Sequence, residues 1–233
     1  MRRLRALLLR GPLWRRLLAG FALALVAGPL VLLLLYRVVP VPLTPLMLIR
    51  LVEGYGIEHD WVSYDEIAPI MVRSVIAAED GKFCSHWGFD WGAITEALDD
   101  AEDGGRLRGG STISQQTAKN VFLWPGRSWL RKGLEAGFTV AIEMVWGKRR
   151  IVEVYLNSVE FGPGVYGVEA AARHHFGIGA DQLSGRQAAL LAAVLPNPIR
   201  FSASKPSAYV NRYASRIEGR ARAIGKGMYP PCD

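Results

Sequence analysis

The sequence predicts a mainly α-helical protein in which one N-terminal membrane-spanning helix precedes one external domain. Three observations lead to this fold class. An uncharged apolar run follows an arginine-rich N-terminus, apolar side chains recur at helical spacing through most of the remaining chain, and no strand-rich block or internal repeat occurs. With 233 residues, half of them apolar, the chain is long enough to bury one substantial core.

The N-terminal segment has the charge pattern of a membrane anchor. Residues 1–16 contain six arginines and no acidic residue, and Leu17–Tyr36 follows with 20 uncharged residues. At about 1.5 Å per residue this run can cross a bilayer core of roughly 30 Å. A cleaved signal peptide is the alternative, but the apolar run continues for seven residues past Gly28, to Leu35, which is longer than such a peptide needs.

The expected topology follows from these arginines. They place residues 1–16 in the cytoplasm, residues 17–36 in the cytoplasmic (inner) membrane as a single pass, and residues 37–233 in the periplasm. Residues 37–52 form a connector in which Pro40, Pro42 and Pro45 favour extended chain. The apolar patch Leu46–Val52 either joins the core or rests on the bilayer surface.

Charge and cysteine content narrow the function classes. The net charge is +7, but without the six N-terminal arginines 22 basic and 21 acidic residues remain, so binding to nucleic acid is not expected. Cys84 and Cys232 are the two cysteines. An oxidising compartment would permit a bridge, yet nothing in their spacing demands one, and we expect two unrelated thiols. No zinc-binding spacing is present.

Beyond the connector, the predicted domain over residues 53–233 consists of helices separated by turn and capping signals. Pro69 suits a first helical position, and Ser184 with Gln187 forms a capping box. Residues 104–110, rich in glycine, are expected to be a mobile loop. With their caps, the expected helices cover about Pro69–Ala78, Asp90–Ala101, Ser111–Phe122, Ser128–Trp146, Lys148–Asn157, Gly167–Phe176, Ser184–Leu195 and Ser207–Ile224.

Glu79 and Asp80 end the first of these helices, although the partial negative charge of a helix C-terminus disfavours carboxylates there. Burial would raise the pKa of Glu79 by desolvation, which suits a general base or acid near neutral pH. The alternative is an ordinary ion pair at a helix end. The composition of the loop that follows favours a catalytic role for Glu79 over an ion pair. This loop contains the polar or charged residues His86 and Asp90 and the aromatic residues Phe83 and Trp87.

Two further segments could bind an anion. Ser111, Thr112, Gln115 and Gln116 place donors at a helix start, where backbone N–H groups favour negative charge, and Lys119 follows one turn later. The lysine of a nucleotide-binding phosphate loop is absent. Downstream, the cations Arg127, Arg131 and Lys132 precede Glu135. The alternatives are a solvated polar helix and a surface ion pair with i,i+4 spacing.

Read together and in order, four motifs resemble those of the family 51 glycosyltransferases, the peptidoglycan polymerases. The matching residues are Glu79, Asp80, Phe83, His86, Gly88 and Asp90; Gly110, Ser111, Thr112, Gln115, Gln116, Lys119 and Asn120; Arg131, Lys132 and Glu135; and Lys148, Ile151, Glu153, Tyr155, Leu156 and Asn157. The match spans roughly residues 61–201. Arg212, Arg216 and Arg220 resemble the family's basic tail only loosely, and no site residue is taken from them.

This resemblance implies a fold and a reaction. The fold is a lysozyme-like, two-lobed, mainly helical glycosyltransferase domain with a membrane-resting lobe. The substrates are the growing glycan chain, as donor, and lipid II, a disaccharide-pentapeptide on undecaprenyl pyrophosphate, as acceptor. Transfer to the 4-hydroxyl of the acceptor N-acetylglucosamine releases the donor's undecaprenyl pyrophosphate.

The resemblance also implies residue roles. Glu79 is the general base and Glu135 the second essential carboxylate, which either orients nearby cations or helps hold a divalent metal, Mg²⁺ or Mn²⁺; the sequence itself requires no cofactor. Lys119, Arg127, Arg131 and Lys132 would neutralise the leaving group. The other substrate-binding candidates are Asp80, Phe83, His86, Ser111, Thr112, Gln115, Gln116 and Asn120. Asp80 and His86 are expected to brace their loop above Phe83, and Glu153 and Asn157 to have structural roles.

Two alternatives from other classes remain open at this point. The first is a lysozyme-like enzyme that cleaves peptidoglycan, either a hydrolase or a lytic transglycosylase. The second is a non-catalytic, membrane-anchored partner of cell-wall synthesis or division proteins. The first would not need the cationic cluster of Lys119, Arg131 and Lys132, and the second would not need Glu79.

Overall fold

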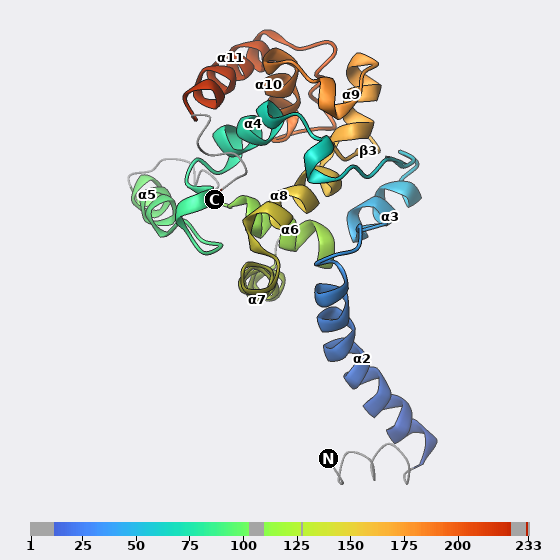
Figure 1. The fold of residues 1–233 in the computed structure, drawn as a ribbon. Helices are drawn as coiled ribbons and strands as arrows, with labels where there is room; N and C mark the ends of the chain where they lie inside the picture. The colour runs from blue at the N-terminus through green and yellow to red at the C-terminus, as the bar shows by residue number, and fades with distance from the viewer. Residues whose placement is uncertain (1–11, 103–109, 127, 225–231, 233) are drawn as a thin grey trace. The chain divides into compact units, whose positions relative to one another are not determined.

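The computed structural model describes residues 12–102, 110–126, 128–224 and 232, and it divides into two compact units, Met1–Val39 and Pro40–Asp233. In the first unit, helix α2 (Leu13–Leu35) contains Pro29 and carries exposed apolar side chains (Figure 1). No helix within the described residues meets the combined length and apolarity that crossing a membrane requires. The span over residues 17–36 therefore stays a prediction, and most of the basic segment 1–16 lies outside the described residues.

The second unit is mainly helical, as predicted. Its short 3₁₀ turns are η1 (Tyr64–Glu66), η2 (Phe83–Ser85) and η3 (Ala180–Gln182). Its helices are α3 (Pro45–Val52), α4 (Pro69–Glu79), α5 (Trp91–Glu102), α6 (Ile113–Phe122), α7 (Trp129–Val145), α8 (Gly147–Ser158), α9 (Val168–Phe176), α10 (Gly185–Val194) and α11 (Ala208–Ala223). Most of the predicted loop over 104–110 lies outside the described residues.

The helix starts follow the predicted capping signals. Each cap side chain accepts a hydrogen bond from a backbone N–H three residues later, which satisfies one of the free donors of the first turn. Thr112 and Gln115 also form a reciprocal capping box, as Ser184 and Gln187 do. The observed caps are Asp90, Thr112, Ser128, Ser184 and Ser207.

Helix α3 divides the apolar patch Leu46–Val52 between two environments. Met47 is fully buried, and α3 packs against α6. Leu48, Leu51 and Val52 are exposed. One side of the patch therefore belongs to the core, and contact of the other side with a bilayer stays a prediction.

A small three-stranded sheet was not expected from the sequence. Its strands are β1 (Glu58–His59), β2 (Glu160–Gly162) and β3 (Val165–Tyr166), in the order β1-β3-β2, with β1 parallel and β2 antiparallel to β3. Gly164 makes the β2–β3 turn at a φ of +74°, and a Cβ there would lie 2.4 Å from the carbonyl oxygen of Tyr55. The turn therefore requires glycine.

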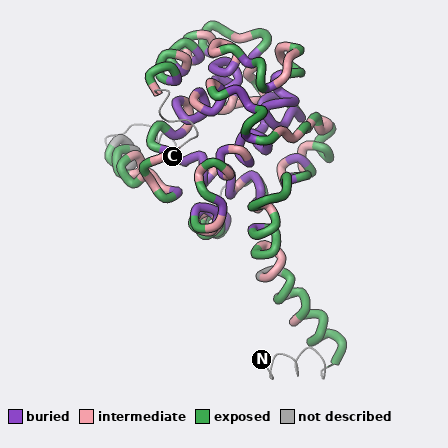
Figure 2. Tube along the Cα trace, in the orientation of Figure 1, coloured by how far each residue is buried: buried purple, intermediate pink, exposed green. Residues whose placement is uncertain are grey.

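Two groups of helices hold the core together. Helices α4, α10 and α11 pack on one another, and α6 packs against both α7 and α8 (Figure 1). Among the helices, buried residues concentrate in α6, α8 and α10 (Figure 2). Asn157 of α8 connects this core to the chain before α4, because its side chain donates to the Val62 carbonyl at 2.9 Å and accepts from the Val62 N–H at 3.0 Å.

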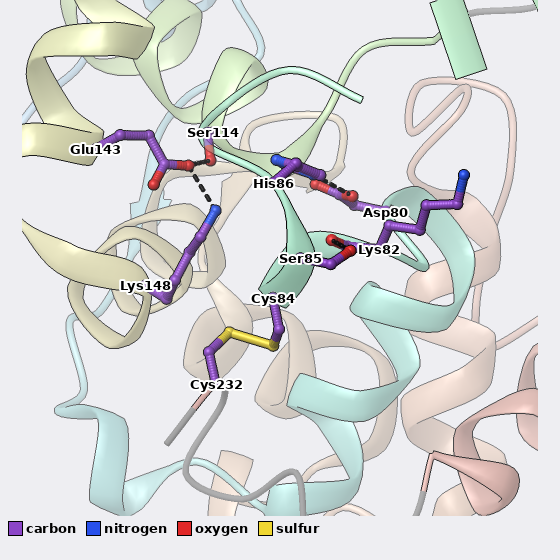
Figure 3. The surroundings of a disulfide bond; sticks show 9 residues. All are labelled: Asp80, Lys82, Cys84, Ser85, His86, Ser114, Glu143, Lys148 and Cys232. Carbon is purple, nitrogen blue, oxygen red and sulfur yellow. Dashed lines mark hydrogen bonds and ion pairs between the residues drawn. A yellow bond between two sulfur atoms is a disulfide. The ribbon is translucent and has the colours of Figure 1, made fainter. Parts of the chain in front are cut away.

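The two cysteines form a disulfide, which corrects the expectation of unrelated thiols. Cys84 lies in η2 and Cys232 near the C-terminus, 148 positions later, with their Cα atoms 4.9 Å apart (Figure 3). The spacing of the two cysteines in the sequence does not predict this disulfide, because the disulfide depends on where the end of the chain lies in the folded protein. The bridge fixes the C-terminus to the loop that carries Asp80 and His86.

We predict that this disulfide stabilises the domain. A bridge that closes so long a loop restricts the unfolded chain and typically adds about 2–5 kcal/mol to the free energy of unfolding. Cys232→Ser should therefore lower the melting temperature by on the order of 10 °C. Thermal unfolding followed by circular dichroism, with and without reductant, measures this.

The effect of reductant on Cys232→Ser is the control for its effect on the wild type. Reductant should lower the melting temperature of the wild type toward that of Cys232→Ser and leave the variant unchanged. A wild-type melting temperature that does not move, with thiol titration showing complete reduction, contradicts the prediction.

Candidate active site

The loop after α4 is fixed to the start of α6 by a buried carboxylate. Asp80, only 7% exposed, accepts from the backbone N–H of Ile113 at 2.9 Å and bonds His86 Nε2 at 2.9 Å (Figure 3). Phe83 is fully buried and meets the His86 ring edge-on. This is the bracing expected for Asp80, His86 and Phe83, and it positions the preceding residue, Glu79.

Glu79 is the last residue of α4 and is partly buried. One of its carboxylate oxygens accepts a hydrogen bond from Gln116 Nε2 at 2.8 Å. Burial raises the pKa of Glu79 above its usual range, and the neighbouring charge of Asp80 acts in the same direction, whereas Gln116 and Lys119 oppose the shift. A raised pKa suits a base that exchanges protons near neutral pH.

Two adjoining cavities lie at this position. The smaller, about 390 Å³, is lined by Glu79, Asp80 and Thr112 among others, and the larger, about 580 Å³, by Lys119, Arg131, Lys132 and Glu135 among others. Ser111 lines both cavities. Gln116 lines the larger cavity and donates to Glu79 in the smaller one, so a single side chain connects the two.

The larger cavity is cationic. Glu135 is buried on α7 and accepts from Arg131 Nη1 at 2.6 Å and from Lys132 Nζ. Burial lowers the pKa of Lys119, with Arg131 and Lys132 adding to that shift and the carboxylates Glu135 and Glu79 opposing it. Three cations therefore surround one carboxylate, which leaves an excess of positive charge facing the cavity.

The structure thus brings together most of the predicted site residues. Gln115 and Asn120 join Ser111, Gln116 and Lys119 along the wall of the larger cavity. Glu153 and Asn157 have other partners, Arg150 at 2.8 Å and Val62. Arg127 lies outside the described residues.

Sequence reasoning missed several residues of these cavities. Arg220 and Ile224 of the C-terminal region line the smaller cavity, and Leu46 lines the larger one. The basic residues of the last predicted helix were a usable signal for Arg220. The positions of Leu46 and Ile224 depend on packing between distant segments, which local patterns do not reveal.

A metal site was the open question at this position. Within the described ranges, no group of three or more His, Cys, Asp or Glu side chains is arranged to hold an ion. Both oxygens of Glu135, the one carboxylate suggested as a ligand, already accept hydrogen bonds from cationic side chains. Glu135 is therefore occupied by cationic side chains and not free to bind an ion in this arrangement.

Comparisons with known proteins agree with these motifs. A family model described as Transglycosylase matches residues 48–228. A protein of Caulobacter vibrioides is 54% identical over 220 residues, covering 94% of this chain and 96% of its own. Similar proteins of Rhodospirillum centenum and a Jannaschia species are 55% and 56% identical, covering 92% and 94% of this chain and 92% and 90% of their own. All three are named biosynthetic peptidoglycan transglycosylase.

The match covers all of the residues that line the two cavities except Leu46. It covers well over half of the chain, and the relatives are similar along nearly their whole length. This confirms the resemblance found in the four motifs. The chain therefore belongs to the transglycosylase family.

Proposed function

We propose that this protein is a peptidoglycan glycosyltransferase that polymerises glycan chains from lipid II. The name shared by its relatives supports this function. The observation that carries it is the joined pair of cavities, in which a partly buried carboxylate, Glu79, adjoins a cation-lined space through Gln116. A base beside an anion-binding pocket is the arrangement needed to attack a sugar that bears a pyrophosphate leaving group.

The residues divide the reaction between them. Glu79 takes the proton from the 4-hydroxyl of the acceptor N-acetylglucosamine, and that oxygen forms a bond to the anomeric carbon of the donor. The bond between this carbon and the pyrophosphate oxygen breaks, and the electron pair leaves with the undecaprenyl pyrophosphate. Lys119, Arg131 and Lys132 stabilise the negative charge that develops there.

In this proposal Glu135 orients cations. Its carboxylate binds Arg131 and Lys132 on the same helix, which holds both side chains toward the larger cavity and limits the repulsion between them. A divalent ion on the pyrophosphate is the alternative role.

The cationic cavity also separates this function from peptidoglycan cleavage of the lysozyme type. A cleaving enzyme expels a sugar hydroxyl, which general acid catalysis assists by protonation. Lys119, Arg131 and Lys132 are not suited to protonate a leaving sugar oxygen. A pyrophosphate, in contrast, leaves as an anion that these groups can stabilise.

We further propose that residues 17–36 anchor the protein in the cytoplasmic membrane, with residues 53–233 in the periplasm. The uncharged run and its preceding arginines support this topology. Exposed apolar side chains of α7, such as Trp129, Leu130 and Met144, support a second contact between the domain and the bilayer.

We predict that Glu79→Gln abolishes polymerisation of lipid II and leaves its binding intact. The substitution keeps the size of the side chain and removes the base, a loss of roughly 10²–10⁴-fold in rate. Gel analysis of glycan products from purified protein and lipid II in detergent measures the rate, and moenomycin, suggested by the family resemblance, probes the site.

The matched control is Glu58→Gln, which removes an exposed carboxylate of β1 and should leave the rate unchanged. Near wild-type polymerisation by Glu79→Gln contradicts the proposed role of Glu79. Solubilisation of intact cell wall by the wild type would instead favour the cleaving enzyme.

We predict that Glu135→Gln is also nearly inactive, because Arg131 and Lys132 lose the charge that orients them. A loss of about 10²-fold or more is expected, on the scale of a removed electrostatic group in an active site. The same assay with increasing Mg²⁺ or Mn²⁺ tests the alternative role. Activity restored by metal contradicts the orienting role and supports metal binding.

We predict that deletion of residues 1–36 releases the protein from firm membrane association. The full chain should remain in membranes after extraction at alkaline pH, and protease added outside intact spheroplasts should digest the domain. Full-length protein released by the alkaline wash, or protected from external protease, contradicts the anchor or its orientation.

A further inference from the structure

A buried tyrosine lies next to the side chain that connects the two cavities. Tyr155 of α8 is fully buried, and its hydroxyl donates to Gln116 Oε1 at 3.4 Å. The other end of the same amide, Nε2, donates to Glu79 at 2.8 Å. A chain of hydrogen bonds therefore runs from α8 through α6 to the carboxylate at the end of α4.

The direction of the Gln116 amide determines its effect on Glu79. With Nε2 toward the carboxylate, the amide stabilises the ionised form. If the amide were reversed, Oε1 would face the carboxylate oxygens and oppose ionisation. The Tyr155 hydroxyl favours the first orientation, because it supplies a donor to Oε1.

The Tyr155 hydroxyl keeps its proton and so can donate a hydrogen bond to Gln116 at neutral pH. Burial raises the pKa of its hydroxyl well above the usual range, and the charges of Glu79 and Asp80 raise it further. The phenol is therefore protonated at neutral pH. Tyr155 lies in a stretch of α8 in which Ile151, Val154 and Leu156 are also fully buried.

We propose that Tyr155 is a positioning residue for polymerisation, whose hydroxyl fixes the Gln116 amide so that it keeps donating to Glu79. The inference rests on the proposed function, because it concerns the ionisation of the proposed base. Tyr155 acts through Gln116 and does not itself touch the reacting atoms.

Other charged and titratable groups also face Glu79. Asp80 adjoins it on the chain, Lys119 approaches from α6, and Tyr213 approaches from α11, where Arg220 lines the same cavity. Tyr155→Phe leaves all of these groups in place. A changed titration of the base in that variant therefore reports on the amide.

The experiment is the pH dependence of kcat/KM for lipid II polymerisation. Glu79 must be ionised to act, so the rate falls as pH falls through its pKa. Without the Tyr155 hydroxyl the ionised form of Glu79 is less favoured, so the pKa of Glu79 rises. The acid limb of the profile, which is the pH range over which kcat/KM falls on acidification, should therefore move to higher pH by about 0.5–1 unit. One hydrogen bond to a charged group accounts for a shift of this size. The rate above the limb should change little.

Two further variants identify the route. Gln116→Leu removes the donor to Glu79 and should move the acid limb upward at least as far. Tyr155→Phe combined with Gln116→Leu should move it no further than Gln116→Leu alone, since Tyr155 acts through Gln116. Tyr213→Phe removes a nearby hydroxyl that bonds the Ala78 carbonyl, and it should leave the limb unchanged.

The proposal is overturned if Tyr155→Phe has the same acid limb as the wild type and differs only in a lower melting temperature. Tyr155 would then have a packing role alone. Additive shifts in the double variant also overturn it. If Tyr155→Phe does not fold, an unshifted limb in Gln116→Leu has the same consequence. These outcomes are distinct from failure of the proposed function, in which the wild-type protein does not polymerise lipid II. They are also distinct from failure of the role of Glu79, in which Glu79→Gln polymerises lipid II at a near wild-type rate.

Discussion

The carboxylate of Asp80 is the contact on which the site depends. It accepts from the first N–H of α6 and bonds His86, so it joins two segments that are 33 residues apart. The N-terminus of a helix favours a negative charge, and a buried carboxylate with several donors is far less costly than an unpaired one. Because Glu79 directly precedes Asp80 and Gln116 lies one turn into α6, this contact also fixes the distance between the base and its donor.

Two effects of opposite sign then set the state of Glu79. Burial raises its pKa, which strengthens it as a base, while Gln116 and Lys119 keep the ionised form accessible. Lys119 also lines the cavity proposed for the leaving group. In the proposed reaction the same cation stabilises ionised Glu79 before transfer and the pyrophosphate during it. Lys119 therefore contributes to the pKa of the proposed base as well as to the proposed anion binding.

The parts of this fold that could be predicted from the sequence are those specified by neighbours in the chain. Helix starts such as Thr112 and Ser184 follow capping signals within three residues, and they were predicted correctly. The pairing of Glu58 with Val165 and the bridge from Cys84 to Cys232 join residues more than 100 positions apart, for which no local signal exists. The hydrogen bond between Gln116 and Glu79 joins residues 37 positions apart, and spacing gives no signal for it either.

The loop after α4 is held from more directions than Asp80 alone provides. Ser114 donates to the buried Glu143 at 2.5 Å, and Lys148 pairs with the same carboxylate at 2.7 Å (Figure 3) while lying over the Phe83 ring. Thr112 donates to the carbonyl of Gly88, where a Cβ would lie 2.6 Å from Thr139. Helices α6, α7 and α8 thus all contact this loop, and the disulfide adds the C-terminus. Because this loop directly follows Glu79, its constraints also position the proposed base. Such preorganisation leaves binding energy available for the transition state.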